Sequence, residues 1–282
     1  MAGYLSRRNL LPAHYRALYL TGSRARGWDN ESSDVDVVVV SPEPFAPPAG
    51  AAEAVGQGSL RISHAKVSVE GRAHDIEYWT VDQVRELLRK ASWQVYEPGQ
   101  GQERQFMLYE INFLDRLGHA LALDGGPTVR EWQETVRSSA FRAMRAAFWL
   151  HDARNYHADS EGQLGSGDVH SAALSARLAV ECAVDALLAR HGQLSPNGKW
   201  RARRFKEASP TALTFDAYWR LQTMQGFDPA RPTAWISTAL DEVAPVLKEV
   251  DAWLSTEHER HHGTGCGADS RAATVSHRER DR

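Results

Sequence analysis

The chain is poor in cysteine, lacks long apolar runs and carries little excess charge of either sign. Its 282 residues include only two cysteines, Cys182 and Cys266, so no disulfide framework is expected. No run of 18 or more apolar residues occurs, which argues against a membrane-spanning helix. The N-terminus carries Arg7 and Arg8 without the apolar stretch of a signal peptide. We therefore expect a cytoplasmic protein with no membrane partner.

The charge balance also bears on the kind of partner. The formal net charge is -3, whereas a long nucleic-acid footprint usually needs a clearly basic face. Nucleic acid is therefore an unexpected partner. Hydrophobic residues make up 42% of the chain, enough for real cores, and the length allows two domains of ordinary size.

One stretch carries more functional information than the rest of the chain. In residues 19–27, YLTGSRARG, an apolar run ends at Gly22 and Ser23, and in residues 33–40, SDVDVVVV, Asp34 and Asp36 open a second apolar run. Residues two apart in a strand point to the same face, so the two carboxylates would lie side by side. Such carboxylates repel each other unless a cation lies between them, and oxygen ligands suit Mg²⁺.

The glycine–serine pair adds a place for phosphate. Gly22 lets the backbone approach a phosphate closely, and Ser23 begins a short helix whose N-terminus favours anions. Arg24 and Arg26 flank this loop, and either is a candidate contact to a triphosphate, although an arginine on a short exposed helix is equally often solvated. A phosphate site beside a metal pair predicts nucleotidyl transfer.

The spacing resembles that of the polymerase-beta-like nucleotidyltransferase superfamily. The pattern G-S-x-x-x-G followed by S-D-x-D is complete in Gly22, Ser23, Gly27, Ser33, Asp34 and Asp36. The resemblance implies two Mg²⁺ ions, an NTP co-substrate such as ATP, and a third carboxylate beside Asp34 and Asp36. Two metal ions roughly 3.5–4 Å apart stabilise both the attacking and the leaving oxygen of an in-line displacement.

The third carboxylate should come from a neighbouring strand. Residues 72–79, RAHDIEYW, offer Asp75 and Glu77 on one face, with His74 on the other, so register alone does not choose between the two carboxylates. By the resemblance, Asp75 before Ile76 matches the polymerase-like form, and Glu77 matches the aminoglycoside-modifying form. We favour Asp75 as the metal ligand and retain both as catalytic residues. One would share the metal, and the other would accept the proton of the substrate hydroxyl.

Two cations in the second half of the chain are candidates for the nucleotide. Arg177 lies in a helical stretch of small and apolar residues, where a buried guanidinium needs an anion. Lys199 follows in residues 195–200, SPNGKW. This order is similar to that in aminoglycoside adenylyltransferases, and the resemblance implies that Arg177 and Lys199 reach the nucleotide across a cleft between domains. The alternatives are an ion pair of Arg177 with Glu181 and a capping role for Lys199. Three neighbours are expected on a solvated face: Arg201, Arg203 and Arg204.

Hydrophobic spacing predicts strands in the first part of the chain. The expected elements are a helix at 10–14, strands at 17–21 and 34–40, a loop at 41–59, and a hairpin of strands 61–69 and 73–79. Thr80 and Gln83 form a capping-box pattern that opens a helix, and another helix is expected at 106–117. No strand is expected after Glu103.

The second part of the chain is predicted to be helical. Its expected elements are a helix with a capping box at Thr128 and Glu131 that ends near residue 156, a polar connector at 159–167, a helix capped by Asp168 and ended by Gly192, and two or three more helices to about residue 254. The tail from Thr256 lacks apolar spacing and is expected to be disordered.

These patterns predict an α+β fold. A mixed-sheet nucleotidyltransferase domain would occupy residues 1–120, a helical bundle residues 121–255 and a disordered tail residues 256–282. Kanamycin and aminoglycoside nucleotidyltransferases share this layout, and the chain resembles them up to about residue 254.

The expected activity is Mg²⁺-dependent transfer of a nucleoside monophosphate to a hydroxyl of a small molecule, such as an antibiotic or a specialised metabolite, with release of pyrophosphate. The group transferred is expected to be AMP, and its donor ATP. Acceptor contacts are expected from the cleft, at Trp79, Tyr96, Glu97 and Tyr109. One alternative is a protein adenylyltransferase of the toxin–antitoxin type, which is usually a minimal catalytic domain. Another is a catalytically silent nucleotide-binding module, against which the intact Asp34 and Asp36 argue.

Overall fold

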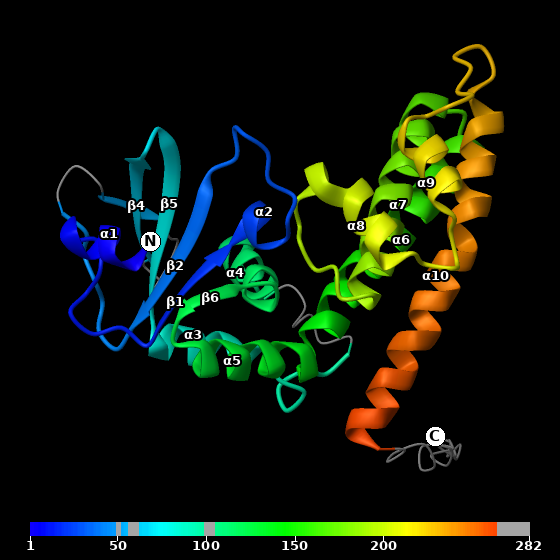
Figure 1. The fold of residues 1–282 in the computed structure, drawn as a ribbon. Coiled ribbons are helices and arrows are strands. Elements are labelled where there is room, and N and C mark those ends of the chain that lie inside the picture. Colours follow the sequence, from blue (N-terminus) through cyan, green and yellow to red (C-terminus); the bar gives the residue numbers. More distant parts are fainter. Residues whose placement is uncertain (49–51, 56–61, 99–104, 264–282) are drawn as a thin grey trace, which may run out of the picture.

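The computed structural model describes residues 1–48, 52–55, 62–98 and 105–263, which form a sheet domain beside a helical domain (Figure 1). The strands are β1 (Ala17–Thr21), β2 (Val35–Ser41), β3 (Ala52–Val55), β4 (Ile62–Val69), β5 (Arg72–Thr80) and β6 (Leu121–Asp124). They lie in the order β3-β4-β5-β2-β1-β6. The β2 and β5 strands are parallel, and every other neighbouring pair is antiparallel. This mixed sheet followed by helices confirms the predicted α+β fold.

The helices divide between the two domains. They are α1 (Ala2–Arg7), α2 (Gly22–Ala25), α3 (Val81–Lys90), α4 (Leu108–Gly118), α5 (Gly126–Ser138), α6 (Phe141–Gly165), α7 (Val169–Arg190), α8 (Arg201–Ala208), α9 (Phe215–Gln222) and α10 (Pro232–His262), with a 3-10 turn η2 (Gly198–Trp200). Among these described residues, no helix is long and apolar enough to cross a membrane.

Helices cover both faces of β2, which explains its continuous apolar run. On one face, Val37 and Val39 belong to a core with Leu5 of α1. On the other face, Val38 and Val40 belong to the core that α3, α4 and α5 build. Polar side chains at the start of β2 therefore lie where a well-packed sheet meets solvent.

The strongest local signals of the sequence are confirmed. The hairpin of β4 and β5 turns at Glu70 and Gly71, whose φ angles of 51° and 79° suit the tight turn that matches strand twist. The capping box of α3 is formed, because Thr80 accepts from the backbone of Gln83 at 3.2 Å and Gln83 accepts from that of Thr80 at 2.8 Å.

The predicted helix at residues 10–14 is wrong, because Leu10 closes a helix that lies earlier in the chain. The Leu10 amide donates to the Leu5 carbonyl at 2.9 Å, the Asn9 amide donates to Ser6 at 3.0 Å, and Asn9 has a φ of 54°. This is a Schellman motif, in which an apolar residue just beyond the cap packs back onto the helix. Leu5 and Leu10 accordingly share one core.

Two elements after residue 120 belong to the sheet domain. The edge strand β6 pairs with β1, contrary to the expectation of no strand after Glu103, and its four exposed residues are too few to show a period. Helix α5 then packs on the same core through Val129, Trp132 and Val136. The first structural unit thus continues beyond the expected boundary at residue 120. Strand β3, within the expected loop at 41–59, was also missed.

The helix predicted from Thr128 to about residue 156 is in fact two helices. Gly125, with a φ of 67°, is the N-cap of α5, Pro127 occupies its first turn, and no side-chain capping bond forms. Pro suits this position because its missing N–H is unsatisfied there anyway. A break at Ser139 separates α5 from α6, where the Ser139 hydroxyl accepts from the Phe141 amide at 3.2 Å.

The polar segment at 159–167 is helical to Gly165, not a connector. Its polar side chains are satisfied by α7: the buried Ser160 hydroxyl donates to the Ala172 carbonyl at 2.8 Å, and Ser175 donates to Gln163 at 2.8 Å. As predicted, Asp168 then caps α7 by accepting from the Ser171 amide at 3.1 Å.

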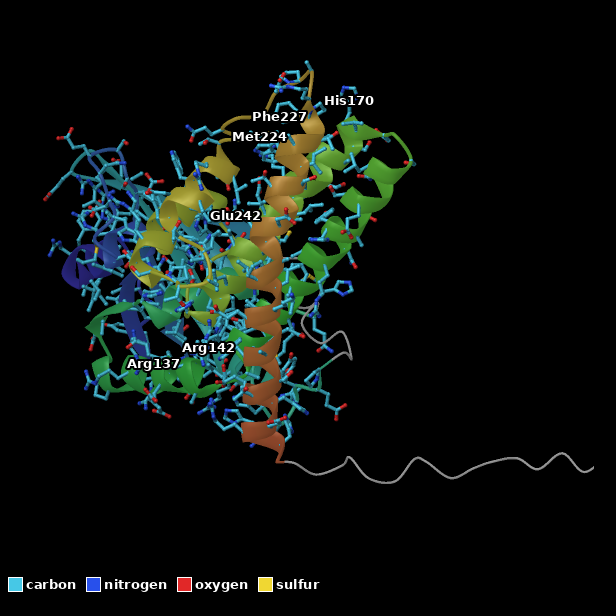
Figure 2. The ribbon with its side chains drawn as sticks, turned by 90° about the vertical axis from the view of Figure 1, so that its right-hand side faces the viewer. Arg137, Arg142, His170, Met224, Phe227 and Glu242 are labelled. Carbon is cyan, nitrogen blue, oxygen red and sulfur yellow. The ribbon has the colours of Figure 1, made fainter. Side chains whose placement is uncertain are left out.

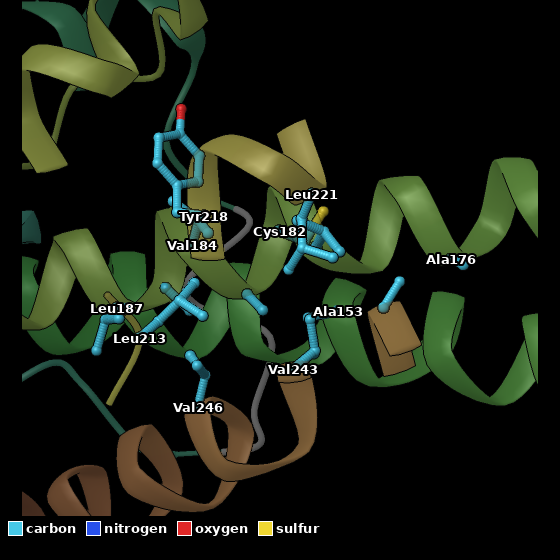
Figure 3. Packing of buried hydrophobic residues seen from close by; sticks show 14 of the residues in the cluster. Ala153, Ala176, Cys182, Val184, Leu187, Leu213, Tyr218, Leu221, Val243 and Val246 are labelled. Atoms are coloured by element: carbon cyan, nitrogen blue, oxygen red, sulfur yellow. The ribbon is translucent and has the colours of Figure 1, made fainter. Parts of the chain in front are cut away.

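The helical domain has its own core, built from α6, α7, α9 and α10. Figure 3 shows Val184 and Leu187 of α7 facing Val243 and Val246 of α10. Cys182 is buried here as a free thiol, and burial raises its pKa to about 12. It is a core residue, as its apolar surroundings predict.

The long helix α10 returns to the sheet domain at its C-terminal end (Figures 1 and 2). His261 stacks on Trp93 with ring centroids 4.0 Å apart, and the buried Glu257 lies 3.7 Å from Arg142 of α6. These contacts keep residues 256–262 helical, so the predicted disorder from Thr256 is wrong to that point. The rest of the predicted tail, including Cys266, lies outside the described residues.

Candidate active site

The site begins where β1 gives way to α2. Gly22, with a φ of 68°, starts α2 directly against β2, because Thr21 pairs with Asp36. A Cβ atom at Gly22 would lie 1.9 Å from Asp36 Oδ2. Both the backbone conformation and the contact therefore require glycine here.

Acidic side chains gather at the start of β2 and β5. Asp36 lies opposite Asp75, and Val38 opposite Glu77, in the parallel register of the two strands, so Asp36, Asp75 and Glu77 share one face. Asp34 is exposed immediately before β2. The pKa of Asp36 is raised to about 6, chiefly by burial and also by the charges of Asp75, Glu77 and Asp34, while the Arg116 charge opposes them.

Glu77 differs from the other carboxylates because it has a cationic partner. Arg116 of α4 donates to Glu77 at 2.6 Å, and the Trp79 indole donates to it at 3.2 Å. Burial by itself would raise the pKa of Glu77, but the Arg116 charge and hydrogen bond outweigh it and hold the pKa below the usual value. Asp75 forms no ion pair within the described residues. The sequence analysis missed Arg116, although charged residues in an otherwise apolar helix were a visible signal.

A cleft of about 340 Å³ lies between the two domains. Six of the predicted site residues line it: Gly22, Ser23, Arg26, Asp36, Glu77 and Lys199. Helix α4 forms one wall with Tyr109, Asn112, Asp115 and Arg116, followed by His119, and the loop before α8 forms another with Ser195, Asn197 and Trp200. Of the expected acceptor contacts, Tyr109 lies in the cleft, whereas Trp79 and Tyr96 are buried in the core.

Arg26, at the end of α2, contacts residues that follow α4 and α7. It lies 2.5 Å from His119 Nε2, donates to Gln193 at 2.8 Å and stacks 4.1 Å from the Trp28 ring. Burial and, to a smaller extent, the Arg26 charge together lower the pKa of His119 to about 4. His119 is therefore neutral near pH 7, and it offers the cleft an uncharged ring.

Three predicted nucleotide-binding residues lie away from this cleft. The Arg24 side chain is 3.7 Å from Asp29, and the Ser33 hydroxyl accepts from the Asn30 amide at 2.9 Å. Arg177 is exposed and donates to Glu181 at 3.0 Å. The premise that Arg177 is buried is wrong, because its small neighbours pack inward on α7 while the arginine points to solvent.

The loop that carries Lys199 is stabilised by a buried network of ion pairs and hydrogen bonds. Asp185 of α7 lies 2.8 Å from Arg201 and 3.3 Å from Arg204, and Arg204 donates to the carbonyls of Gln193 and Asn197. The expectation of a solvated face is thus wrong for Arg201 and Arg204. The spacing of residues along the sequence could not predict this burial, because the partner of both arginines, Asp185, lies on another helix.

The buried carboxyl of Asp115 is another unpredicted member of the cleft. It is only 7% exposed, and its Oδ1 has no hydrogen-bond partner among the described residues. Burial raises the pKa of Asp115, although Arg26, Arg204, Arg116 and the Leu194 amide oppose this. A wall of this kind favours a ligand that donates hydrogen bonds.

The carboxylates fit an open magnesium site better than a closed one. Among the described residues, no three His, Cys, Asp or Glu side chains converge to hold a metal ion. Mg²⁺ is usually held by one or two carboxylates, with waters and substrate phosphates completing its shell. Asp36 and Asp75 supply such a pair, and a cation between them would relieve the repulsion that raises the Asp36 pKa.

The first domain is similar in sequence to a known protein family. Residues 6–98 match the family described as nucleotidyltransferase domain, about a third of the 282-residue chain. The fold is similar to the crystal structure of a nucleotidyltransferase-like protein from Exiguobacterium sibiricum 255-15, with a TM-score of 0.50 and 11% identity over 92% of this chain and 78% of that one. At this identity the likeness shows the fold alone. No curated protein matches in sequence. Residues 6–98 are thus similar to a nucleotidyltransferase domain, and this similarity supports a transferase enzyme.

Proposed function

We propose that this protein transfers a nucleoside monophosphate, with ATP as the first donor to test, to a hydroxyl of a small molecule such as an antibiotic or specialised metabolite, and releases pyrophosphate. The observation that carries the proposal is the contact of Gly22 with Asp36, opposite Asp75, beside a cleft between two domains. It combines a close backbone approach for phosphate with carboxylates, Asp36 and Asp75, that form no ion pair in the part of the chain that the structure describes. The aminoglycoside-type resemblance remains part of this proposal.

In the proposed reaction, the acceptor oxygen forms a bond to the α-phosphorus while the bond from that phosphorus to the pyrophosphate oxygen breaks. Asp36 and Asp75, with Asp34 beside them, would hold Mg²⁺. When bound, the metal supplies positive charge to the attacking and leaving oxygens. Gly22 and Ser23 would bind phosphate oxygens, with Lys199 facing them from the helical domain.

The structure favours a division of labour between Asp75 and Glu77. A base needs a free lone pair and a pKa that allows it to accept a proton. Glu77 is bound to Arg116 and has a lowered pKa, so we assign the hydroxyl proton to the oxygen of Asp75 that does not bind the metal. Glu77 is assigned the positioning of Arg116, which lines the cleft beside Asp36.

A small acceptor suits the dimensions and lining of the cleft. Its volume of about 340 Å³ lies at the lower end of the range for small-molecule sites, roughly 300–1,000 Å³. Tyr109, Asn112 and Asp115 present hydrogen-bonding groups from one helix, which suits a hydroxyl-rich acceptor. A protein acceptor would have to insert a side chain between the domains.

The test is mass spectrometry of the protein with ATP, Mg²⁺ and a panel of hydroxylated acceptors. We expect an acceptor that gains a nucleotidyl mass together with free pyrophosphate, and neither product with Asp36→Asn. A matched control is Asp82→Asn, an exposed carboxylate of α3 whose side chain is 86% accessible. A nucleotidyl mass on protein instead would favour the protein adenylyltransferase alternative. Pyrophosphate release that survives in Asp36→Asn would contradict the proposed site.

A further inference from the structure

A second cavity lies across the sheet from the cleft. It has a volume of about 720 Å³, and its lining includes Tyr4, Arg7, Arg24, Glu70, Arg72 and His74. Strand residues alternate between faces, so Val35 lines this cavity while Asp36 lines the cleft. The two hollows therefore share the same end of β2 and are separated by the thickness of the sheet.

The lining of this cavity is strongly positive. It contains three arginines against one carboxylate, that of Glu70. Arg24 lies 3.7 Å from Asp29, whereas neither Arg7 nor Arg72 forms an ion pair within the described part of the chain. Guanidinium groups that face one hollow repel each other, and an anion between them removes that cost.

The cavity walls are fixed by the fold. Arg72 begins β5 and is paired in register with Val69 of β4. His74 is 4% exposed, and its Nδ1 lies 3.0 Å from the Arg72 carbonyl. Tyr4 of α1 donates to the Ser68 carbonyl at 3.3 Å. Donors held on a strand and an anchored helix lose less entropy on binding than donors on a free loop.

We propose that this cavity binds a small phosphate-bearing anion, separately from the nucleotide cleft. Planar guanidinium groups match phosphate geometry by bidentate hydrogen bonding, and the volume suits a small molecule. The ligand contacts Arg7 and Arg72, and Arg24 of α2 contributes a third guanidinium group. An occupant here contacts Val35 and His74, which immediately precede Asp36 and Asp75 in the sequence.

The experiment is calorimetric titration of pyrophosphate and, separately, of glucose 6-phosphate into the full chain in EDTA. The first ligand represents a free polyphosphate and the second a phosphate ester, and the tighter one identifies the source. We expect Arg7→Ala and Arg72→Ala each to weaken binding at least tenfold, the effect of losing one charge-assisted contact. Arg220→Ala, an exposed arginine of α9, is the matched control and should bind like the wild type.

Lys199→Ala separates this cavity from the cleft. It should leave the binding of glucose 6-phosphate unchanged, because Lys199 lines only the cleft of these two hollows. The proposal is overturned if neither ligand binds at millimolar concentration, if Arg7→Ala and Arg72→Ala bind normally while folded by circular dichroism, or if Lys199→Ala weakens the binding of glucose 6-phosphate as much as they do. The titration measures binding and not turnover. Its result therefore tests this cavity even if the proposed transfer reaction is not observed.

Discussion

Asp185 of the helical domain and Asp36 of the sheet domain are both carboxylates withdrawn from solvent, but within the described residues only Asp185 forms ion pairs. Asp185, 3% exposed, lies against Arg201 and Arg204 at 2.8 and 3.3 Å. Asp36 is half-buried, and its charged neighbours include three carboxylates. Buried charge that is paired by the protein serves the structure, whereas buried charge left without a partner is available to a ligand.

The largest effect should come from removing Asp36, the carboxylate without an ion pair among the described residues. Asp36→Asn should lower transfer by at least about a thousandfold, since several kcal/mol of transition-state stabilisation depend on charge at this position. Folding should survive, because Asn is close in shape to Asp. Turnover with Mg²⁺ and ATP, measured beside Asp82→Asn, tests this, and activity within tenfold of the wild type would remove Asp36 from the site.

Strand β5 carries both kinds of carboxylate, because Glu77 is paired with Arg116 whereas Asp75 forms no ion pair among the described residues. Asp75→Asn should lower turnover by about 10²–10⁴-fold as a lost base, with little change in stability. Glu77→Gln should lower the free energy of unfolding by about 1.5–3 kcal/mol, because Arg116 loses a charged partner. Turnover and urea denaturation of both variants give the answer. A stable but inactive Glu77→Gln beside an active Asp75→Asn would reverse the two roles.

In the helical domain, the paired charge should matter for stability. Asp185→Asn leaves Arg201 and Arg204 without their shared carboxylate and should cost about 3–5 kcal/mol of unfolding free energy. Asp241→Asn, an exposed position on α10, should stay within about 0.5 kcal/mol of the wild type. Urea denaturation measures both. Equal stability of the two variants would mean that the network contributes nothing to the fold.

Lys199 and Arg177 test which cations of the helical domain face the nucleotide. Lys199→Ala should weaken Mg²⁺–ATP binding roughly ten- to a hundredfold, the loss of one charge-assisted contact. Arg177→Ala should bind normally, because Arg177 is exposed and engaged with Glu181 at 3.0 Å. Calorimetric titration, with circular dichroism to check folding, decides this. A loss only in Arg177→Ala would place the nucleotide outside the cleft.

The smallest effect is a pH dependence of stability from Asp36. Its folded pKa of about 6 lies above the unfolded value, so the folded state holds more protons in between, and stability falls as pH rises through about 6. Without metal, Asp36→Asn should therefore be more stable than the wild type at pH 8, by on the order of 2 kcal/mol. The difference should vanish below about pH 4. Thermal unfolding in EDTA across this range tests it, and equal curves at pH 8 would contradict a charge penalty at Asp36.

The part of the site that was predictable is the part that the chain encodes locally. Gly22 and Asp36 are separated by one turn and one short loop, and the hairpin that carries Asp75 follows from alternation and two turn residues. The helix at 106–117 was also predicted, but its role was not. Arg116 and Asp115 line the cleft only because α4 packs beside the sheet, and no spacing in the sequence encodes that packing.

The errors in the helical part have a common cause. Polarity at 159–167 indicated a connector, yet Ser160 and Gln163 find hydrogen-bond partners on α7. Arg177, in an apolar segment, was expected to be buried, whereas Arg201 and Arg204, in a basic segment, were expected to be solvated. Each prediction assigned burial from neighbours in sequence, while partners on other helices decided it.

The junction at Trp28 has a consequence for attempts to divide this protein. The Trp28 indole donates to Glu207 at 2.7 Å, its carbonyl accepts from Arg203 at 3.2 Å, and its ring lies 5.6 Å from that of Trp200. A sheet domain expressed alone would expose this indole. Arg26, which follows Gly22 and Ser23 at the end of α2, would also lose its hydrogen bond to Gln193. The shortest fragment that preserves the structure around Gly22 and Ser23 must therefore include the helical domain, although the family match ends at residue 98.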